Sequence, residues 1–307
     1  MQRNRLQFSA PSSLRACLDD PDLSVFLDRE FDGTPGLIQE FPLLVGASNR
    51  ARRFVIEEDG RIVTHAAWRP FCLLSGTERF SAAGIGLVTT HRERRGRGLA
   101  SCVVQHCLQD AQAQGAELAL LFAPQRDLYR RLGFVPAGTE RMSVIENTAP
   151  GPLHGKIRVG DARDASDLLS MLSRHPLRVE RSLEEFKILL AIPDVHTHVL
   201  ERQGRPVAYC VEGKGRDMRG VIHEWGGAAS AVGELLTAVA EGLPGPTYVL
   251  SSEAEPPPVK GRSITQALAQ VRVLCPERFG SQDPVHIFGD PETPSRIPIY
   301  LWGLDSV

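Results

Sequence analysis

The first half of the chain alternates runs of residues typical of strands with runs typical of helices. Two runs rich in β-branched and aromatic residues flank Glu58–Gly60, a hairpin turn sequence, and a second turn at Ser75–Thr77 leads into a third such run. We therefore expect three antiparallel strands in series between residues 53 and 90. Before them, the sequence predicts two short helices, over residues 14–20 and 22–33.

The pattern changes after the third strand. The apolar positions of the next run recur at intervals of four, which predicts an amphipathic helix ended by Gly115; they are Leu99, Val103, Cys107 and Ala111. A buried strand over 116–123, a short helix ending at Gly133 and a pair of strands over 135–146 are expected to complete this half.

The second half repeats this order of elements, although not the residues. Helices are expected over 161–176, 182–193, 228–242 and 264–274, and strands over 196–215 (a hairpin turning at Gln203–Gly204), 219–227, 246–252 and 297–304. The Pro- and Gly-rich residues 147–155 indicate a linker. We predict an internal duplication: a mixed α/β (α+β) fold of two tandem domains, 1–148 and 155–307, each a mostly antiparallel sheet flanked by helices.

Composition excludes several classes of protein. The 307 residues carry 35 basic and 37 acidic side chains, so we expect no general affinity for nucleic acid. No apolar run reaches the roughly 20 residues that span a bilayer, and the N-terminus lacks the apolar region of a signal peptide. The six cysteines form no C-x-x-C pair, which favours small buried side chains over a metal site. We expect a cytoplasmic protein that binds neither a membrane nor a metal.

The segment with the clearest chemistry is Arg95–Ala100, which follows an expected strand and opens an expected helix. Its glycines allow the backbone to approach a ligand closely, and the free N–H groups of a helix start attract anions. Arginines add full charges that bind phosphate in a fork; they are Arg92, Arg94, Arg95 and Arg97. The ligand indicated is a phosphate or pyrophosphate.

Three known patterns of phosphate-binding loop contain glycines at a similar spacing to this segment. The P-loop pattern is absent, and the dinucleotide-binding pattern finds Ser101 where its third glycine belongs and follows hairpin-linked strands. The pattern [QR]-x-x-G-x-[GA] is met by Arg95, Gly98 and Ala100. The chain therefore resembles the GCN5-related N-acetyltransferases (GNAT), whose pyrophosphate loop has this pattern. Residues 129–134, YRRLGF, resemble that family's YxxLGF element and support the resemblance.

The resemblance implies acetyl-CoA as co-substrate and a role for each matched residue. The strand ending in Val88, Thr89 and Thr90 would diverge from strand 116–123, and its backbone groups would bind the pantetheine arm. The loop Arg95, Gly96, Arg97, Gly98, Leu99 and Ala100 would bind the pyrophosphate. Tyr129 would protonate the leaving thiolate after direct attack of an amine, and a backbone N–H near Val88 would polarise the thioester carbonyl.

The sequence offers several candidates for the general base. The expected strand before the loop carries no carboxylate, and His91 follows it directly; histidine titrates near neutral pH. Glu93 and Glu140 are weaker candidates, and a water relay is another. The chain also resembles tandem members of the family, mycothiol synthase and the enhanced-intracellular-survival aminoglycoside acetyltransferases. The latter use their C-terminal carboxylate as base, so Val307 or Asp305 is a further candidate.

In the second half, residues 223–228 occupy the position of the loop but contain no arginine. We expect this half to bind no cofactor and to complete an acceptor cleft, with Glu224, Trp225 and Trp302 either lining that cleft or packing in the core. The function expected is N-acetylation of a small-molecule or peptide amine. The alternatives are a CoA-binding sensor or scaffold without turnover and transfer of a different acyl group. A homo-oligomer is compatible with the sequence.

Overall fold

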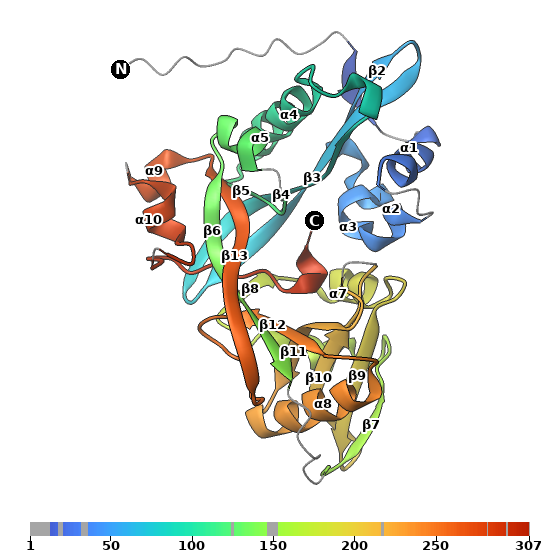
Figure 1. Ribbon diagram of the computed structural model, residues 1–307, viewed down its shortest axis with the longest axis vertical. Helices are drawn as coiled ribbons and strands as arrows, with labels where there is room; N and C mark the ends of the chain where they lie inside the picture. Colours follow the sequence, from blue (N-terminus) through green and yellow to red (C-terminus); the bar gives the residue numbers. More distant parts are fainter. Residues whose placement is uncertain are drawn as a thin grey trace.

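The computed structural model of the chain describes residues 13–17, 21–31, 36–123, 126–145, 153–215, 218–280, 282–292 and 294–306. Its strands form one continuous sheet of 13 strands, in which strands of both sequence halves alternate near the middle. Figure 1 shows the two halves above and below this middle region, with the last residues of the chain between them. The expected mixed α/β class, with a mostly antiparallel sheet flanked by helices, is confirmed.

The three strands expected between residues 53 and 90 are present. They are β2 (Arg53–Glu58), β3 (Arg61–Ser75) and β4 (Glu78–Thr90), paired antiparallel in series. Asp59 and Gly60 have φ angles of 51° and 71° in the first turn, which suits the short polar side chain and the glycine found there. The helix predicted over 14–20 is wrong, because β1 (Leu14–Ala16) pairs with β2 as an edge strand.

Helices cover both faces of these strands (Figure 1). On one face lie α1 (Asp22–Glu30), α2 (Leu37–Glu40), α3 (Pro42–Val45) and the 3-10 helix η1 (Ala47–Arg52). On the other lies α4 (Leu99–Ala113), whose predicted apolar stripe is buried against the strands. The short strand β5 (Leu118–Leu121) and helix α5 (Arg126–Arg131) follow as expected.

The two halves exchange strands at the centre of the sheet. Residues 135–145 form one strand, β6 (Val135–Ile145), instead of the predicted pair. The helix predicted over 264–274 is also wrong: Gly261–Val273 form strand β13, which lies between β5 and β6. β6 in turn pairs with β12 (Tyr248–Ser252) of the second half. Backbone pairing between segments far apart in sequence thus overrides the local pattern.

The other predicted elements of the second half are present. They are α6 (Ala165–Leu172), α7 (Leu183–Leu190), β9 (His196–Arg202), β10 (Arg205–Glu212), β11 (Val221–Gly227), α8 (Ala229–Gly242) and β12. The sequence did not reveal β7 (Lys156–Val159), β8 (Leu177–Glu180), α9 (Pro276–Phe279) or α10 (Pro284–Phe288). β8 pairs with β3 and so joins the halves a second time.

The last residues form no terminal strand, contrary to the prediction. Residues 297–302 run without regular structure into the 3-10 helix η3 (Gly303–Asp305), whose residues are buried. The six cysteines are free, and four of them are buried as expected. Most of the predicted linker, residues 147–152, lies outside the described residues, and the division into domains 1–148 and 155–307 stays a prediction. No helix in the described ranges is long and apolar enough to cross a membrane.

Candidate active site

The predicted divergence of two strands is the main feature of the site. β4 and β5 run parallel but pair only where Ala82–Gly84 lie beside Leu118–Leu120. Beyond Gly84, β4 continues to Thr90 without pairing to β5, which ends at Leu121. Backbone N–H and C=O groups on this side of β4 are therefore available to a ligand that enters between the strands. β11 and β12 repeat this arrangement, since only Val221–Ile222 pair with Tyr248–Val249.

A β-bulge interrupts β4 within this segment. His65 lies opposite Thr89 and Ala67 opposite Gly86, so Leu87 and Val88 together face one residue of β3. Leu87 has a φ angle of 49°. A bulge redirects the backbone groups of the extra residue out of the ladder, and bulges are frequent beside active sites.

The loop after β4 has the geometry of an anion site. Gly96 and Gly98 have φ angles of 77° and 76°, which favour glycine, and a Cβ at either would meet nothing within 4 Å. Helix α4 begins at Leu99 with no side-chain hydrogen bond at its N-cap, so its first N–H groups are directed toward solvent or a ligand. Gly96, Arg97 and Gly98 are exposed, and Leu99 and Ala100 are half-buried.

Two carboxylates that the sequence analysis missed hold three arginines of this loop. Glu58 accepts a hydrogen bond from Arg94 Nε at 2.7 Å and one from Arg97 NH1 at 3.1 Å. Although desolvation opposes the shift, these hydrogen bonds lower the pKa of Glu58. Arg95 donates from Nε to the carbonyl oxygen of Thr90 at 3.0 Å, and its NH2 lies 3.5 Å from Glu30. Nothing local in the sequence marks these contacts, because Glu30 and Glu58 come from other elements.

One ring nitrogen of His91 is engaged in a hydrogen bond. Its Nδ1 accepts a hydrogen bond from the backbone N–H of Glu93 at 3.3 Å and so caps the 3-10 helix η2 (Arg92–Arg94). Its Nε2 lies 4.0 Å from a carboxylate oxygen of Glu30. A neutral ring whose Nδ1 accepts carries its proton on Nε2, so this arrangement leaves no free lone pair for a substrate proton.

Tyr129 lies on α5, directly beyond the end of β5. Tyr129 is 4% exposed, and its ring meets Phe134 edge-on at a centroid distance of 5.9 Å. Burial raises the pKa of the phenol to about 12. Tyr129 is therefore protonated at neutral pH, as a proton donor must be.

The two weaker base candidates differ in their surroundings. Glu93 is exposed on the loop. Glu140 lies on β6, where burial raises the pKa of its carboxyl and Gln266 donates a hydrogen bond to it at 2.8 Å. Val135, on the same strand, lies level with Gly84 of β4 across the sheet, through the pairings of β6 with β13, β13 with β5 and β5 with β4. Glu140 thus lies at the level where β4 has parted from β5, and two strands, β5 and β13, lie between its strand and β4.

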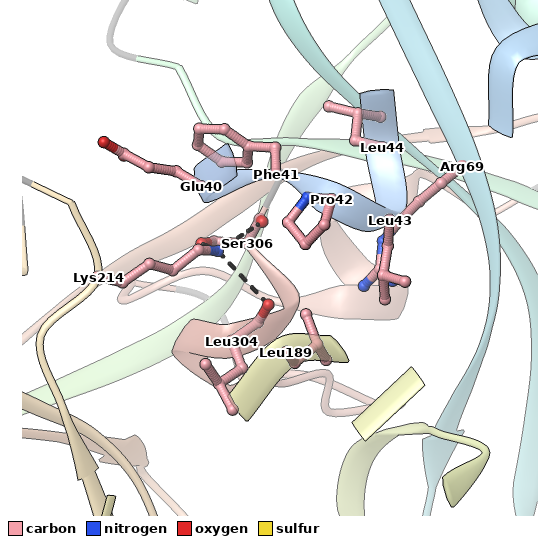
Figure 2. A pocket seen from close by; sticks show the side chains of 10 residues that line it. All are labelled: Glu40, Phe41, Pro42, Leu43, Leu44, Arg69, Leu189, Lys214, Leu304 and Ser306. Atoms are coloured by element: carbon pink, nitrogen blue, oxygen red, sulfur yellow. Dashed lines mark hydrogen bonds between the residues drawn. The ribbon is translucent and has the colours of Figure 1, made fainter. Parts of the chain in front are cut away.

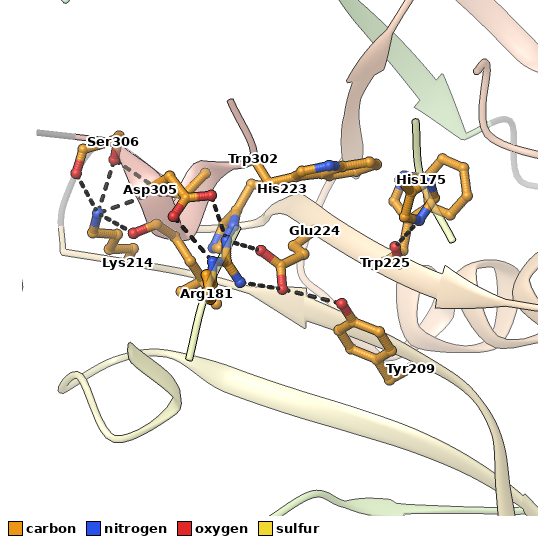
Figure 3. A network of polar contacts seen from close by, with 12 residues as sticks. His175, Arg181, Tyr209, Lys214, His223, Glu224, Trp225, Trp302, Asp305 and Ser306 are labelled. Atoms are coloured by element: carbon orange, nitrogen blue, oxygen red, sulfur yellow. Dashed lines mark hydrogen bonds and ion pairs between the residues drawn. The ribbon is translucent and has the colours of Figure 1, made fainter. Parts of the chain in front are cut away.

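The expected acceptor-cleft residues of the second half lie in its core. Glu224 is fully buried and bound by Arg181 at 2.6 Å. Trp225 and Trp302 are 7% and 0% exposed and pack edge-on, as Figure 3 shows. Asp305 is also fully buried, and its carboxylate lies 2.6 Å from Arg181. This ion pair argues against Asp305 as a base that exchanges protons with a substrate, and Val307 lies outside the described residues.

A narrow pocket adjoins η3 (Figure 2), where α2, α3 and α7 approach it. Lys214 is 5% exposed there. Its ammonium donates to the hydroxyl of Ser306 at 2.8 Å and to the carbonyl oxygens of Ser306 and Gly303 at 3.1 and 3.3 Å. Burial, followed by the charge of Arg69, lowers the pKa of Lys214 to about 7. Among the described residues, no group of three or more His, Cys, Asp or Glu could hold a metal ion.

Comparison with known proteins gives this geometry a family. Residues 26–137 match the family model "Acetyltransferase (GNAT) domain". The resemblance noted in the sequence is thereby confirmed over residues 26–137. No curated protein sequence matches the chain.

Solved structures share the fold over most of the chain. A GCN5-related N-acetyltransferase from Kribbella flavida is 19% identical with a TM-score of 0.60, covering 75% of this chain and 62% of its own. Eis1 from Mycobacterium abscessus is 16% identical with a TM-score of 0.60, covering 87% and 75%. N-myristoyltransferase from Saccharomyces cerevisiae, solved with myristoyl-CoA, is 12% identical with a TM-score of 0.54, covering 86% and 80%. The chain thus spans less than two thirds of the Kribbella protein.

Proposed function

We propose that the protein transfers an acetyl group from acetyl-CoA to the primary amine of a small molecule or peptide, with the first half (1–148) as the catalytic domain. The observation that carries this proposal is the separation of β4 from β5 directly before a glycine loop that opens α4. A pantetheine arm fits between strands whose backbone groups are free to pair with it, and a pyrophosphate fits at a helix start.

Each part of the co-substrate has a counterpart in this arrangement. The backbone of Val88, Thr89 and Thr90 would pair with the pantetheine arm. The N–H groups of residues 96–100, with Arg95 and Arg97, would bind the pyrophosphate. Arg97 would exchange its contact with Glu58 for the more highly charged phosphates, and Glu58 would keep Arg94.

The reaction proposed is direct attack of the amine nitrogen on the thioester carbonyl. The C–N bond forms, the C–S bond breaks, and the electron pair of that bond leaves on sulfur. Tyr129 would donate its phenolic proton to the departing thiolate, and the Val88 N–H would stabilise the negative charge on the carbonyl oxygen. The proton of the attacking amine leaves to a general base, for which His91, Glu140 and a water relay are the candidates.

A CoA-binding sensor without turnover is the second candidate function, because the described residues on β4 beside the expected thioester include no carboxylate. One experiment separates the two. Acetyl-CoA binding is measured by calorimetry, and thiol release is followed with a panel of small-molecule and peptide amines. Turnover with any amine supports the enzyme, whereas tight binding with silence across the panel supports the sensor. Myristoyl-CoA and succinyl-CoA in the same assay test the acyl group, and light scattering tests whether the protein forms a homo-oligomer.

A further inference from the structure

Leu87 adopts a backbone conformation that a leucine rarely takes. In the described part of the chain, four residues other than glycine have a positive φ angle; Asp59, Asp194 and Gln203 lie in turns, and Leu87 lies inside a strand with φ of 49°. Glycine is the usual residue at the left-handed position of such a bulge, and a leucine there is strained. Its side chain is 7% exposed and packs with residues of α1, so the surrounding structure imposes the conformation.

His65 of β3 contacts this strained residue. The imidazole is fully buried, and its Nδ1 lies 2.8 Å from the carbonyl oxygen of Leu87. Burial lowers the pKa of His65 to about 4, so the ring is neutral at working pH. A neutral imidazole has one N–H, and the carbonyl oxygen can only accept, so that N–H is on Nδ1. Within the described residues Nε2 has no hydrogen-bond partner, which leaves the bond to Leu87 as the ring's polar contact.

This bond fixes the direction of the next N–H. The carbonyl of Leu87 and the N–H of Val88 belong to one peptide unit, which is planar and trans, so the two groups point in opposite directions. β3 and β5 flank β4 on opposite sides. The hydrogen bond to His65 holds the Leu87 carbonyl toward β3. The Val88 N–H therefore points away from β3, to the side of β4 where pairing with β5 has ended. Hydrogen bonding to the carbonyl also polarises the peptide and strengthens its N–H as a donor.

We propose that His65 is a positioning residue for acyl transfer: by donating to the Leu87 carbonyl, it holds the bulge in the conformation that aims the Val88 N–H at the thioester carbonyl. This inference rests on the proposed function. It predicts that the donor at the place of Nδ1 is required, whereas the rest of the ring is not.

Two variants separate the donor from the ring. His65→Asn keeps an amide N–H near the place of Nδ1, and His65→Leu keeps a similar volume without a donor. If His65→Leu does not fold, His65→Gln replaces it, because its amide reaches the place of Nε2 instead. The matched control is His198→Leu. His198 lies on β9 of the second half, and its Nε2 likewise has no hydrogen-bond partner among the described residues.

The first measurement is the infrared carbonyl stretch of bound ¹³C-labelled acetyl-CoA, which requires binding but no turnover. We expect a shift to lower frequency in wild type, His65→Asn and His198→Leu, and its loss in His65→Leu. For turnover, we expect kcat of His65→Leu to fall on the order of 10- to 100-fold with little change in KM for acetyl-CoA. If His65→Leu shows the infrared shift and the kcat of the wild type, the proposed role of His65 is wrong. The proposed function would not be affected by that result. Failure of the wild type to bind acetyl-CoA would overturn the proposed function itself.

Discussion

The carboxylate of Asp305 lies 2.6 Å from the guanidinium of Arg181, and neither side chain is more than 2% exposed. Arg181 also binds Glu224 at 2.6 Å, and Arg69 of β3 approaches Asp305 to 3.3 Å. The carboxylate of Asp305 thus contacts arginines of both halves, and Figure 3 shows it beside Arg181. This contact ties η3 to the sheet of the first half and to the core of the second.

Replacing Asp305 with asparagine tests how much this contact stabilises the fold. The change leaves Arg69 buried without the carboxylate that faces it, while Arg181 keeps Glu224. Leaving a buried charge without its partner costs about 3–5 kcal/mol. We expect the free energy of unfolding in urea to fall by about that amount. Glu184→Gln is the control, because its pair with Lys187 is exposed and contributes about 0.5 kcal/mol or less. Equal losses in the two variants would contradict the expectation.

The exchange of strands predicts that the first half does not fold alone. A fragment ending at residue 150 lacks β13, which in the full chain pairs with both β5 and β6, and it lacks β12 on the far side of β6. The unpaired backbone groups and apolar faces then favour aggregation. We expect no cooperative thermal transition by circular dichroism for 1–150, and recovery on co-expression with 153–307. A soluble 1–150 fragment that melts cooperatively and binds acetyl-CoA would contradict this.

The errors of sequence prediction lie mainly where distant segments meet. The hairpins of β2, β3 and β4 depend on turns that are local in sequence, and these were predicted correctly. The partners of β13, β5 and β6, come from the other half, so no local signal in the sequence indicates this pairing. The segment was therefore predicted as a helix. The loop arginines were found, but not Glu58 and Glu30, which hold them. A motif shows which residues are candidates, whereas contacts between distant elements depend on the tertiary fold.

Gly98→Ala tests the loop. The substitution meets no steric contact, so its effect comes from the left-handed φ of 76°, which costs a residue with a Cβ about 1–2 kcal/mol. If the loop shifts to relieve this strain, acetyl-CoA should bind about 5- to 30-fold more weakly by calorimetry. Gly242→Ala, at the end of α8 with no neighbour within 4 Å, should bind as the wild type does. A Gly98→Ala protein with unchanged affinity would argue against a pyrophosphate at this loop.

Lys214 predicts a pH dependence of stability. Its pKa is about 7 in the folded state, against 10.5 for the free side chain. Between these values the unfolded chain binds a proton that the folded chain does not, so stability rises with pH there. We expect the difference in unfolding free energy between wild type and Lys214→Met to shift in favour of wild type from about pH 7 to 10, measured in urea. The difference isolates Lys214 from the thiols and phenols that titrate in the same range, and a flat difference would contradict the prediction.

Tyr129→Phe tests the proton donor. Phenylalanine keeps the ring that packs on Phe134, so we expect little change in melting temperature or in KM for acetyl-CoA. General acid catalysis contributes about 10²- to 10⁴-fold, and kcat should fall by about 10²-fold or more. Because the pKa of Tyr129 is about 12, the wild-type phenol stays protonated up to about pH 11, and its loss of a proton should lower kcat only above that pH.

His91→Ala is the companion variant to Tyr129→Phe. The substitution removes the cap of η2. The lone pair of Nδ1 already accepts a hydrogen bond from Glu93, so no lone pair available to a substrate proton is lost, and we expect a smaller loss of kcat than in Tyr129→Phe. Kinetics with one amine acceptor at saturating acetyl-CoA measure both variants. If His91→Ala loses more activity than Tyr129→Phe while binding acetyl-CoA normally, the histidine is the general base and its ring must turn away from Glu93 during the reaction. If Tyr129→Phe keeps the wild-type kcat, the thiolate takes its proton from another donor.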